Sequence, residues 1–96
     1  MVNAAELRDL VAERQEWLLV RELGATFPLL ASEIDLVEDE GKVHFGFIDE
    51  AGFHSWRLNG FGHNDGEVTI DVAGAFAKKR ETMRLVPRIA AAELAA

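Results

Sequence analysis

The stretch that decides the fold is KVHFGFIDEAGFHSWRLNGFGHNDGEVTIDV, residues 42–72, in which polar and apolar residues alternate in three successive runs. The alternating positions on the buried side are Val43, Phe45 and Phe47, then His54, Trp56 and Leu58, then Val68, Ile70 and Val72. A side-chain period of two predicts strands buried on one face, and short glycine-containing turns between them make neighbouring strands antiparallel. We therefore predict a small curled sheet that supplies most of the core.

The turns on either side of these runs define further strands. Asp39-Glu40-Gly41 suits a three-residue hairpin loop, with the glycine in the left-handed conformation, and it follows a strand expected at residues 34–38. Similar turn chemistry recurs at residues 49–52 and 64–66. The four strands predicted up to this point are residues 34–38, 42–48, 53–60 and 67–72.

Glycines interrupt the third of these strands. Gly60 and Gly62 fall inside a segment that otherwise continues the strand, and such glycines often mark a bulge or a sharp bend that closes small barrels. A meander of four or five strands with this bend curls readily into an SH3-like half-barrel. A fifth strand would be residues 82–86, although a helix at residues 75–84 competes, and we favour a loop or single turn followed by the strand.

Helices are expected at both ends of the chain. Asn3 can cap a first helix, with Glu6 placed for a capping box. An apolar stripe extends this predicted helix to Leu23, where Gly24 would stop it; the stripe consists of Leu7, Leu10, Val11, Trp17 and Leu18. Residues 25–33 form either a short helix beginning near Pro28 or a structured connection.

The end of the chain predicts a short C-terminal helix. Pro87 would open it, and residues 89–96 are strong helix formers. A helix this short is marginal by itself. It would either dock on the sheet or lead into the remainder of a longer protein, and we favour the second interpretation. The overall prediction is one α+β domain over residues 1–96, with an N-terminal helix packed on a curled antiparallel sheet of four or five strands.

Composition narrows the class of protein. The chain has 96 residues and no cysteine, which rules out disulfides, thiolate metal sites and a cysteine nucleophile. No apolar run approaches the roughly 20 residues of a membrane span, and the N-terminal sequence does not resemble a secretory signal. We therefore expect a cytoplasmic protein that does not bind membranes.

The net charge of −7 is unevenly distributed. Residues 1–72 hold five lysines and arginines against fifteen acidic residues, whereas residues 73–96 hold five against two. The acidic body argues against broad adhesion to phosphate backbones. The cations that could attract an anionic partner are Lys78, Lys79, Arg80, Arg84 and Arg88. We favour the plainer interpretation, in which they pair with the acidic body of the same chain.

The three histidines do not predict a metal site. In a hairpin centred on Glu50 and Ala51, His44 falls opposite Arg57 or Leu58 and not opposite His54. The sequence contains neither a His-x-His nor a His-x₃-His pair, the short spacings typical of zinc ligands. The acidic clusters lie at predicted hairpin tips, where water solvates carboxylates, and no calcium-binding loop pattern surrounds them. No metal or other cofactor is therefore predicted.

Nucleophilic catalysis also lacks support. Ser55 follows His54 directly, so the two side chains alternate to opposite faces of the strand and cannot bond as nucleophile and base. Residues 60–62, Gly-Phe-Gly, resemble a fragment of a phosphate-binding loop, but a strand follows where phosphate binding needs a helix N-terminus.

The most informative functional pattern combines aromatic and basic residues. The predicted binding residues are Trp56, Arg57, Phe61, Phe76, Lys78, Lys79, Arg80 and Arg84. Tryptophan, phenylalanine and arginine are favoured anchors of protein interfaces, and small barrels also stack the bases of single-stranded nucleic acid on strand aromatics. The competing interpretation, favoured for Trp56, is that its ring is simply part of the core.

The sequence therefore predicts a non-catalytic interaction module. Its contact surface would comprise the strand at residues 53–61 and the basic segment at residues 76–88, which would bind a protein partner or a second copy. The alternative is an accessory nucleic-acid-binding domain of a larger protein that uses residues 76–88. A small enzyme with an unrecognised site is the third and weakest interpretation.

Overall fold

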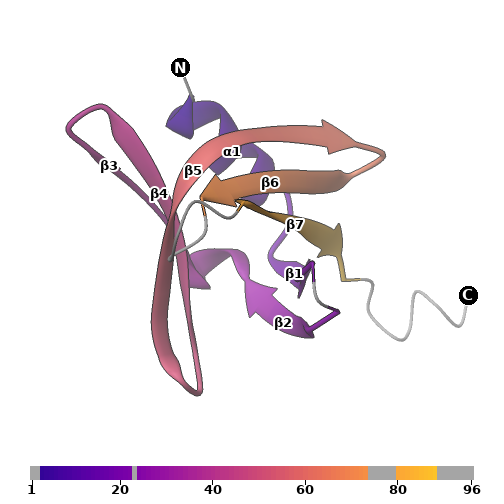
Figure 1. Cartoon of the computed structure of the whole chain (residues 1–96). Helices are drawn as coiled ribbons and strands as arrows, with labels where there is room; N and C mark the ends of the chain where they lie inside the picture. Colours follow the sequence, from indigo (N-terminus) through magenta and orange to yellow (C-terminus); the bar gives the residue numbers. More distant parts are fainter. Residues whose placement is uncertain (1–2, 23, 74–79, 89–96) are drawn as a thin grey trace, which may run out of the picture.

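A computed structural model describes residues 3–22, 24–73 and 80–88 (Figure 1). Within these ranges the chain forms one α-helix, α1 (Ala4–Ala12), and one short 3₁₀ turn, η1 (Ala31–Glu33). The strands are β1 (Glu16–Val20), β2 (Thr26–Leu30), β3 (Ile34–Asp39), β4 (Lys42–Asp49), β5 (Gly52–Asn64), β6 (Glu67–Ala73) and β7 (Arg80–Pro87). The predicted α+β fold with an N-terminal helix and a curled antiparallel sheet is confirmed. The sheet has seven strands, however, and not four or five.

The strands lie in the order β2-β1-β7-β6-β5-β4-β3, and every neighbouring pair is antiparallel. The first and last strands of this order, β2 and β3, follow each other in the chain with only η1 between them. The sheet must therefore curl until its two edges approach at that corner. Figure 1 shows the result as a half-barrel, in which β5 rises from the lower hairpin and bends into the layer that it forms with β6.

The bend in β5 was predicted, and the pairing confirms it. The first part of this 13-residue strand pairs with β4 and the second part with β6. The register with β6 shifts between Leu58 and Gly60, which identifies a β-bulge or a similar irregularity. One continuous strand therefore belongs to both halves of the curled sheet.

The hairpin turn between β3 and β4 is tighter than predicted. Asp39 pairs with Lys42, so the loop between β3 and β4 contains two residues and not three. Both loop residues, Glu40 and Gly41, have positive φ, at 51° and 78°. Positive φ at both central positions is the mark of a type I′ turn, whose twist matches that of the flanking strands.

The predicted first helix is wrong beyond Ala12. Residues 16–20 form β1, in which Trp17 and Leu19 are fully buried while Leu18, between them, faces the other side of the sheet. β1 pairs with both β2 and β7, and this tertiary pairing overrides the helical spacing of the apolar residues. The indole Nε1 of Trp17 donates a hydrogen bond to the carbonyl oxygen of Val11 at 3.0 Å, and this bond connects the end of α1 to β1.

Residues 26–33 form strand β2 and turn η1, so of the two alternatives for this segment the short helix near Pro28 is wrong and a structured connection is what the chain forms. Proline is tolerated here because β2 is an edge strand. Pro87, which was expected at the start of a helix, is the last residue of β7. The predicted strand at residues 82–86 is confirmed within β7, whereas the predicted helix at residues 89–96 lies outside the described residues.

Arg8 Nη2 donates a hydrogen bond to the carbonyl oxygen of Leu36 at 3.0 Å, and this bond holds α1 against the edge strand β3.

The core fills the inner face of the curled sheet. The helix and every strand except β3 contribute buried apolar side chains. These are Ala4, Leu7, Val11, Trp17, Leu19, Leu29, Val43, Phe45, Phe47, Trp56, Leu58, Val68, Ile70, Val72, Met83 and Leu85.

We predict that Gly46→Ala destabilises the fold by about 1–3 kcal/mol. A Cβ at Gly46 would lie 2.8 Å from the carbonyl oxygen of His54 and 3.0 Å from the ring of Phe53, so β4 and β5 would have to separate. Gly60→Ala is the matched control, because a Cβ there meets nothing within 4 Å. Urea unfolding of both variants measures the difference. Equal destabilisation by the two substitutions would contradict the close approach at Gly46.

Candidate functional site

The structure does not bring the described members of the predicted aromatic and basic site onto one face. Trp56 points inward and is 9% exposed, whereas Arg57 is exposed on the outer face, opposite His44. Phe61 is half-buried against the core, next to Ile70 in register. The predicted placement of His44 opposite Arg57 is confirmed, and so is its separation from His54.

The basic members of the predicted site lie on β7 or outside the described residues. Arg80 and Arg84 are exposed, and Arg84 Nη1 donates to Glu67 Oε1 at 2.9 Å. This ion pair is of the kind expected from the sequence, in which cations of the basic segment pair with carboxylates of the same chain. Phe76, Lys78 and Lys79 are outside the described residues.

Trp56 lies at the centre of a stack of aromatic and charged groups. The guanidinium of Arg21, which directly follows β1, is 5.0 Å from the centroid of the indole. The ring of His54 stacks on the indole with a centroid separation of 5.9 Å and an interplanar angle of 13°. An arginine at this distance from a tryptophan ring forms a cation–π contact. We call these residues, together with the two carboxylates described next, the Trp56 stack.

A carboxylate terminates the Trp56 stack at each end. Glu81 accepts two hydrogen bonds from Arg21, at 2.6 and 2.7 Å, in a bidentate pair. Asp49 Oδ1 lies 2.8 Å from His54 Nε2 and also accepts the backbone N–H of Ala51 at 2.8 Å. The order of contacts is therefore Glu81, Arg21, Trp56, His54 and Asp49.

The local folding of the strands explains why these groups meet. His54 and Trp56 are two residues apart on β5, so both side chains face inward, where Phe47 lies 5.4 Å from each ring. Glu81 pairs in register with Val72 on β6, which puts its side chain on the same inner face. The Trp56 stack therefore connects the end of β1 and the start of β7 to the β4–β5 hairpin.

The pairing of these groups explains their pKa shifts. The hydrogen bonds between Arg21 and Glu81 raise the pKa of the guanidinium and lower the pKa of the carboxyl, against the opposing effect of burial. The hydrogen bond with His54 is the largest effect lowering the pKa of Asp49. In the described part of the chain, no buried side-chain nitrogen or oxygen lacks a hydrogen-bond partner. The polar groups of the Trp56 stack thus satisfy one another's hydrogen-bonding capacity.

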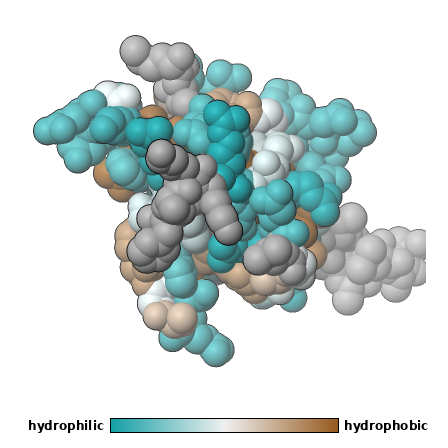
Figure 2. Space-filling view, viewed as in Figure 1, coloured by the Kyte–Doolittle hydropathy of each residue, from teal (hydrophilic) through white to brown (hydrophobic). Residues whose placement is uncertain are grey.

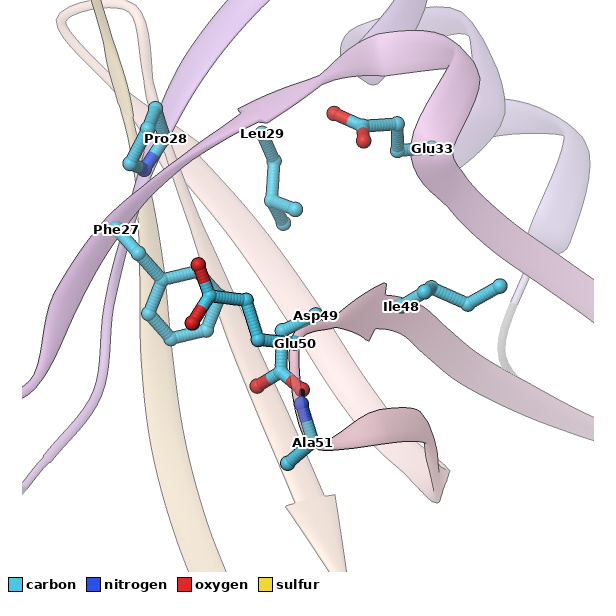
Figure 3. Close-up of a pocket in the computed structure, with 8 residues that line it drawn as sticks. All are labelled: Phe27, Pro28, Leu29, Glu33, Ile48, Asp49, Glu50 and Ala51. Carbon is cyan, nitrogen blue, oxygen red and sulfur yellow. Dashed lines mark hydrogen bonds between the residues drawn. The ribbon is translucent and has the colours of Figure 1, made fainter.

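A groove lies between β2 and the β4–β5 hairpin (Figure 3). Its volume is about 690 Å³, and it is open to solvent. The lining residues are Phe27, Pro28 and Leu29 from β2, Glu33 from η1, and Ile48, Asp49, Glu50 and Ala51 from the hairpin. None of these residues belongs to the predicted binding set. The contact between Phe27 and Phe47, with ring centroids 5.2 Å apart, forms only because the curl brings β2 to β4.

Two large apolar side chains stand exposed beside this groove. Ile48 is 60% exposed and Phe53 is 57% exposed, and the two residues are paired across β4 and β5. Ile48 also lines the groove, which makes the apolar surface continuous. We call the set Phe27, Pro28, Leu29, Ile48 and Phe53 the hairpin surface. Figure 2 shows apolar side chains along the lower left flank of the molecule, where the β4–β5 arm lies, and mainly polar side chains above.

Comparisons with known proteins found no family model, no curated protein and no solved structure that matches this chain. No α-helix within residues 3–22, 24–73 and 80–88 is long and apolar enough to cross a membrane. The same part of the chain contains no group of three or more histidine, aspartate or glutamate side chains placed to hold a metal ion.

The pair between Arg21 and Glu81 predicts an acid-sensitive contribution to stability. Because the folded-state pKa of Glu81 is lowered, this contribution is full above the ordinary value of 4.5 and is lost as the pH falls through the folded-state pKa. We expect Glu81→Gln to lower the free energy of unfolding at neutral pH by roughly 1–2 kcal/mol. The loss of stability on acidification should then be shallower in the variant than in the wild-type protein.

Urea unfolding between neutral pH and about pH 3 measures this difference. Glu50→Gln is the control, since Glu50 makes no ion pair or side-chain hydrogen bond in the described part of the structure. Parallel pH profiles for the wild-type protein and Glu81→Gln would contradict the assigned role of the pair.

Proposed function

We propose that this protein is a non-catalytic interaction module that binds a protein partner through the hairpin surface. The observation that carries the proposal is the exposure of Ile48 and Phe53, adjacent across two strands and continuous with an apolar groove. Isolated exposed apolar residues need no explanation, but large side chains that gather beside a groove are typical of interaction sites.

The polar groups of the Trp56 stack support a non-catalytic role. General acid–base catalysis near neutral pH relies on carboxyls whose pKa is raised toward that range. The pKa values of Asp49 and Glu81 are instead lowered, because each carboxylate accepts a hydrogen bond from a basic side chain. His54, the base nearest Ser55 in sequence, is bonded to Asp49 and faces away from the serine side of β5.

A protein partner accounts for the arrangement better than nucleic acid. Trp56, the ring expected to stack on bases, lies beneath Arg21 and His54 and is nearly buried. Arg84, one of the expected phosphate contacts, already pairs with Glu67. The accessible apolar side chains lie instead beside Asp49 and Glu50, whose charge repels phosphates.

Site-specific photo-crosslinking in the native host tests the protein-binding function. A photoreactive phenylalanine analogue at Phe53 should give discrete protein adducts, because this side chain would lie in the interface. The same analogue at Thr69, which is exposed on the outer face of β6, is the matched control. Adducts from Phe53 should diminish when Ile48→Ser is added. Identical adducts from both positions, or none from Phe53, would rule against the hairpin surface.

Fluorescence anisotropy with labelled single- and double-stranded oligonucleotides tests the nucleic-acid alternative. We expect no salt-dependent binding, because the body of the protein is acidic and Arg84 is paired. The double variant Arg80→Ala plus Arg84→Ala serves as the comparison. Binding that weakens with salt and is lost in that variant would favour the alternative instead.

A further inference from the structure

The groove between β2 and the β4–β5 hairpin has a distinct chemical character. Five of its eight lining residues are apolar, and the other three are Glu33, Asp49 and Glu50. Among the residues that the structure describes, no lysine, arginine or histidine lines it. A ligand that fills this groove must therefore combine apolar surface with positive charge.

Each carboxylate of the groove retains the capacity to accept further hydrogen bonds. Glu33 Oε1 accepts the backbone N–H of Leu30 at 2.7 Å, and Asp49 is bonded to His54 and to the backbone of Ala51 and Gly52. A carboxylate has about four acceptor positions, so each of the two can accept at least one more hydrogen bond. Glu50 makes no ion pair or side-chain hydrogen bond within the described residues. Figure 3 shows Glu33 and Glu50 reaching the groove from opposite sides, with the side chain of Leu29 pointing into the space between them.

The free edge of β2 does not offer the usual route for peptide binding by strand addition. Pro28 has no backbone N–H, and the N–H of Leu30, two residues further on the same edge, is occupied by Glu33. A peptide strand added at this edge could therefore not receive a backbone hydrogen bond from position 28 or from position 30. The occupant of the groove must therefore be held mainly by its side chains.

The shape of the surface favours a segment of polypeptide over a compact small molecule. A second hollow of about 200 Å³ shares Pro28, Leu29 and Glu33 with the groove and is also lined by Leu30 and Arg88. The groove also reaches Ile48, whose cross-strand neighbour is the exposed Phe53. The apolar surface therefore extends beyond the groove itself, to residues that a compact small molecule in the groove would not cover.

We propose that this groove binds a short peptide segment of a partner protein in which a lysine or arginine is flanked by apolar residues. The apolar side chains pack on Phe27, Leu29 and Ile48, and the cation lies between Glu33 and Glu50. Residues 1–72 carry fifteen acidic side chains against five cations, and this charge attracts such a segment before contact. The proposal rests on the proposed function and specifies the chemistry of the partner.

Fluorescence anisotropy with three sets of labelled, acetylated peptides tests the proposal. The first set alternates leucine with lysine or arginine, the second replaces each cation with glutamate, and the third replaces each leucine with serine. We expect the first set to bind at least about tenfold more tightly than the other two, because only it satisfies both the carboxylates and the apolar walls. Equal binding of all three sets, or none, would overturn the proposal.

Charge-reversal variants of the full chain separate the groove from the general acidity of the protein. Glu50→Lys should weaken binding of the first peptide set by roughly tenfold, since it puts a cation where the ligand cation lies. Glu40→Lys makes the same change in net charge at the tip of the β3–β4 hairpin and should weaken peptide binding much less. Equal effects of the two variants would show attraction to net charge alone and would overturn the groove site.

The outcomes also distinguish this inference from the proposed function. If Phe53 crosslinks a partner but no peptide set binds, the peptide chemistry is wrong and the interaction module stands. If the protein is dimeric by light scattering and Glu50→Lys dissociates the dimer, the occupant is a second copy and the peptide proposal fails. If crosslinking and peptide binding both fail, the proposed function falls with the inference.

Discussion

The bend in β5 is the constraint on which the rest of the structure depends. Because the register shifts between Leu58 and Gly60, one strand pairs with β4 over its first half and with β6 over its second. A straight strand of 13 residues would extend to roughly 40 Å and would hold the two halves of the sheet in one open layer. The bend instead lets Phe45, Ile70 and Leu85 share a single core.

The curl also determines where the accessible surfaces lie. It brings Phe27 of edge strand β2 against Phe47 of β4, and the groove opens beside this contact. It also brings Arg21, which Glu81 holds, over Trp56, so the ring that would be a typical interface anchor is covered by Arg21 and His54. The same folding event thus removes one candidate binding residue from the surface and creates a different concave site.

The central part of the fold could be predicted from sequence because its information is local. Alternation along residues 42–72 and the turn residues around Gly41 and Gly66 determine strands, turns and inward faces without knowledge of distant partners. The segment at residues 16–20 is different, since Trp17-Leu-Leu-Val is apolar on both sides. Such a run fits a central strand between β2 and β7 as well as it fits a buried helix, and only the pairing decides.

The candidate site was less predictable for the same physical reason. Asp49 and Glu50 were expected as solvated residues of a hairpin tip, and their positions in the chain give no sign of Phe27 or Glu33 nearby. Those residues are far apart in sequence, and they meet because the edges of the sheet converge at η1. Contacts that depend on the closure of a whole sheet leave no short motif for a sequence to display.

The position of β1 in the sheet has a consequence for how the chain folds during synthesis. β1 lies between β2 and β7, yet it is synthesised before strands β2 to β6, and β7 is completed only at Pro87. Until the ribosome has released residues 80–87, the hairpin of β1 and β2 lacks its neighbour and Leu19 lacks its partner Leu85. Closure of the domain therefore waits for its last strand, and a nascent chain shorter than this leaves apolar surface open to chaperones.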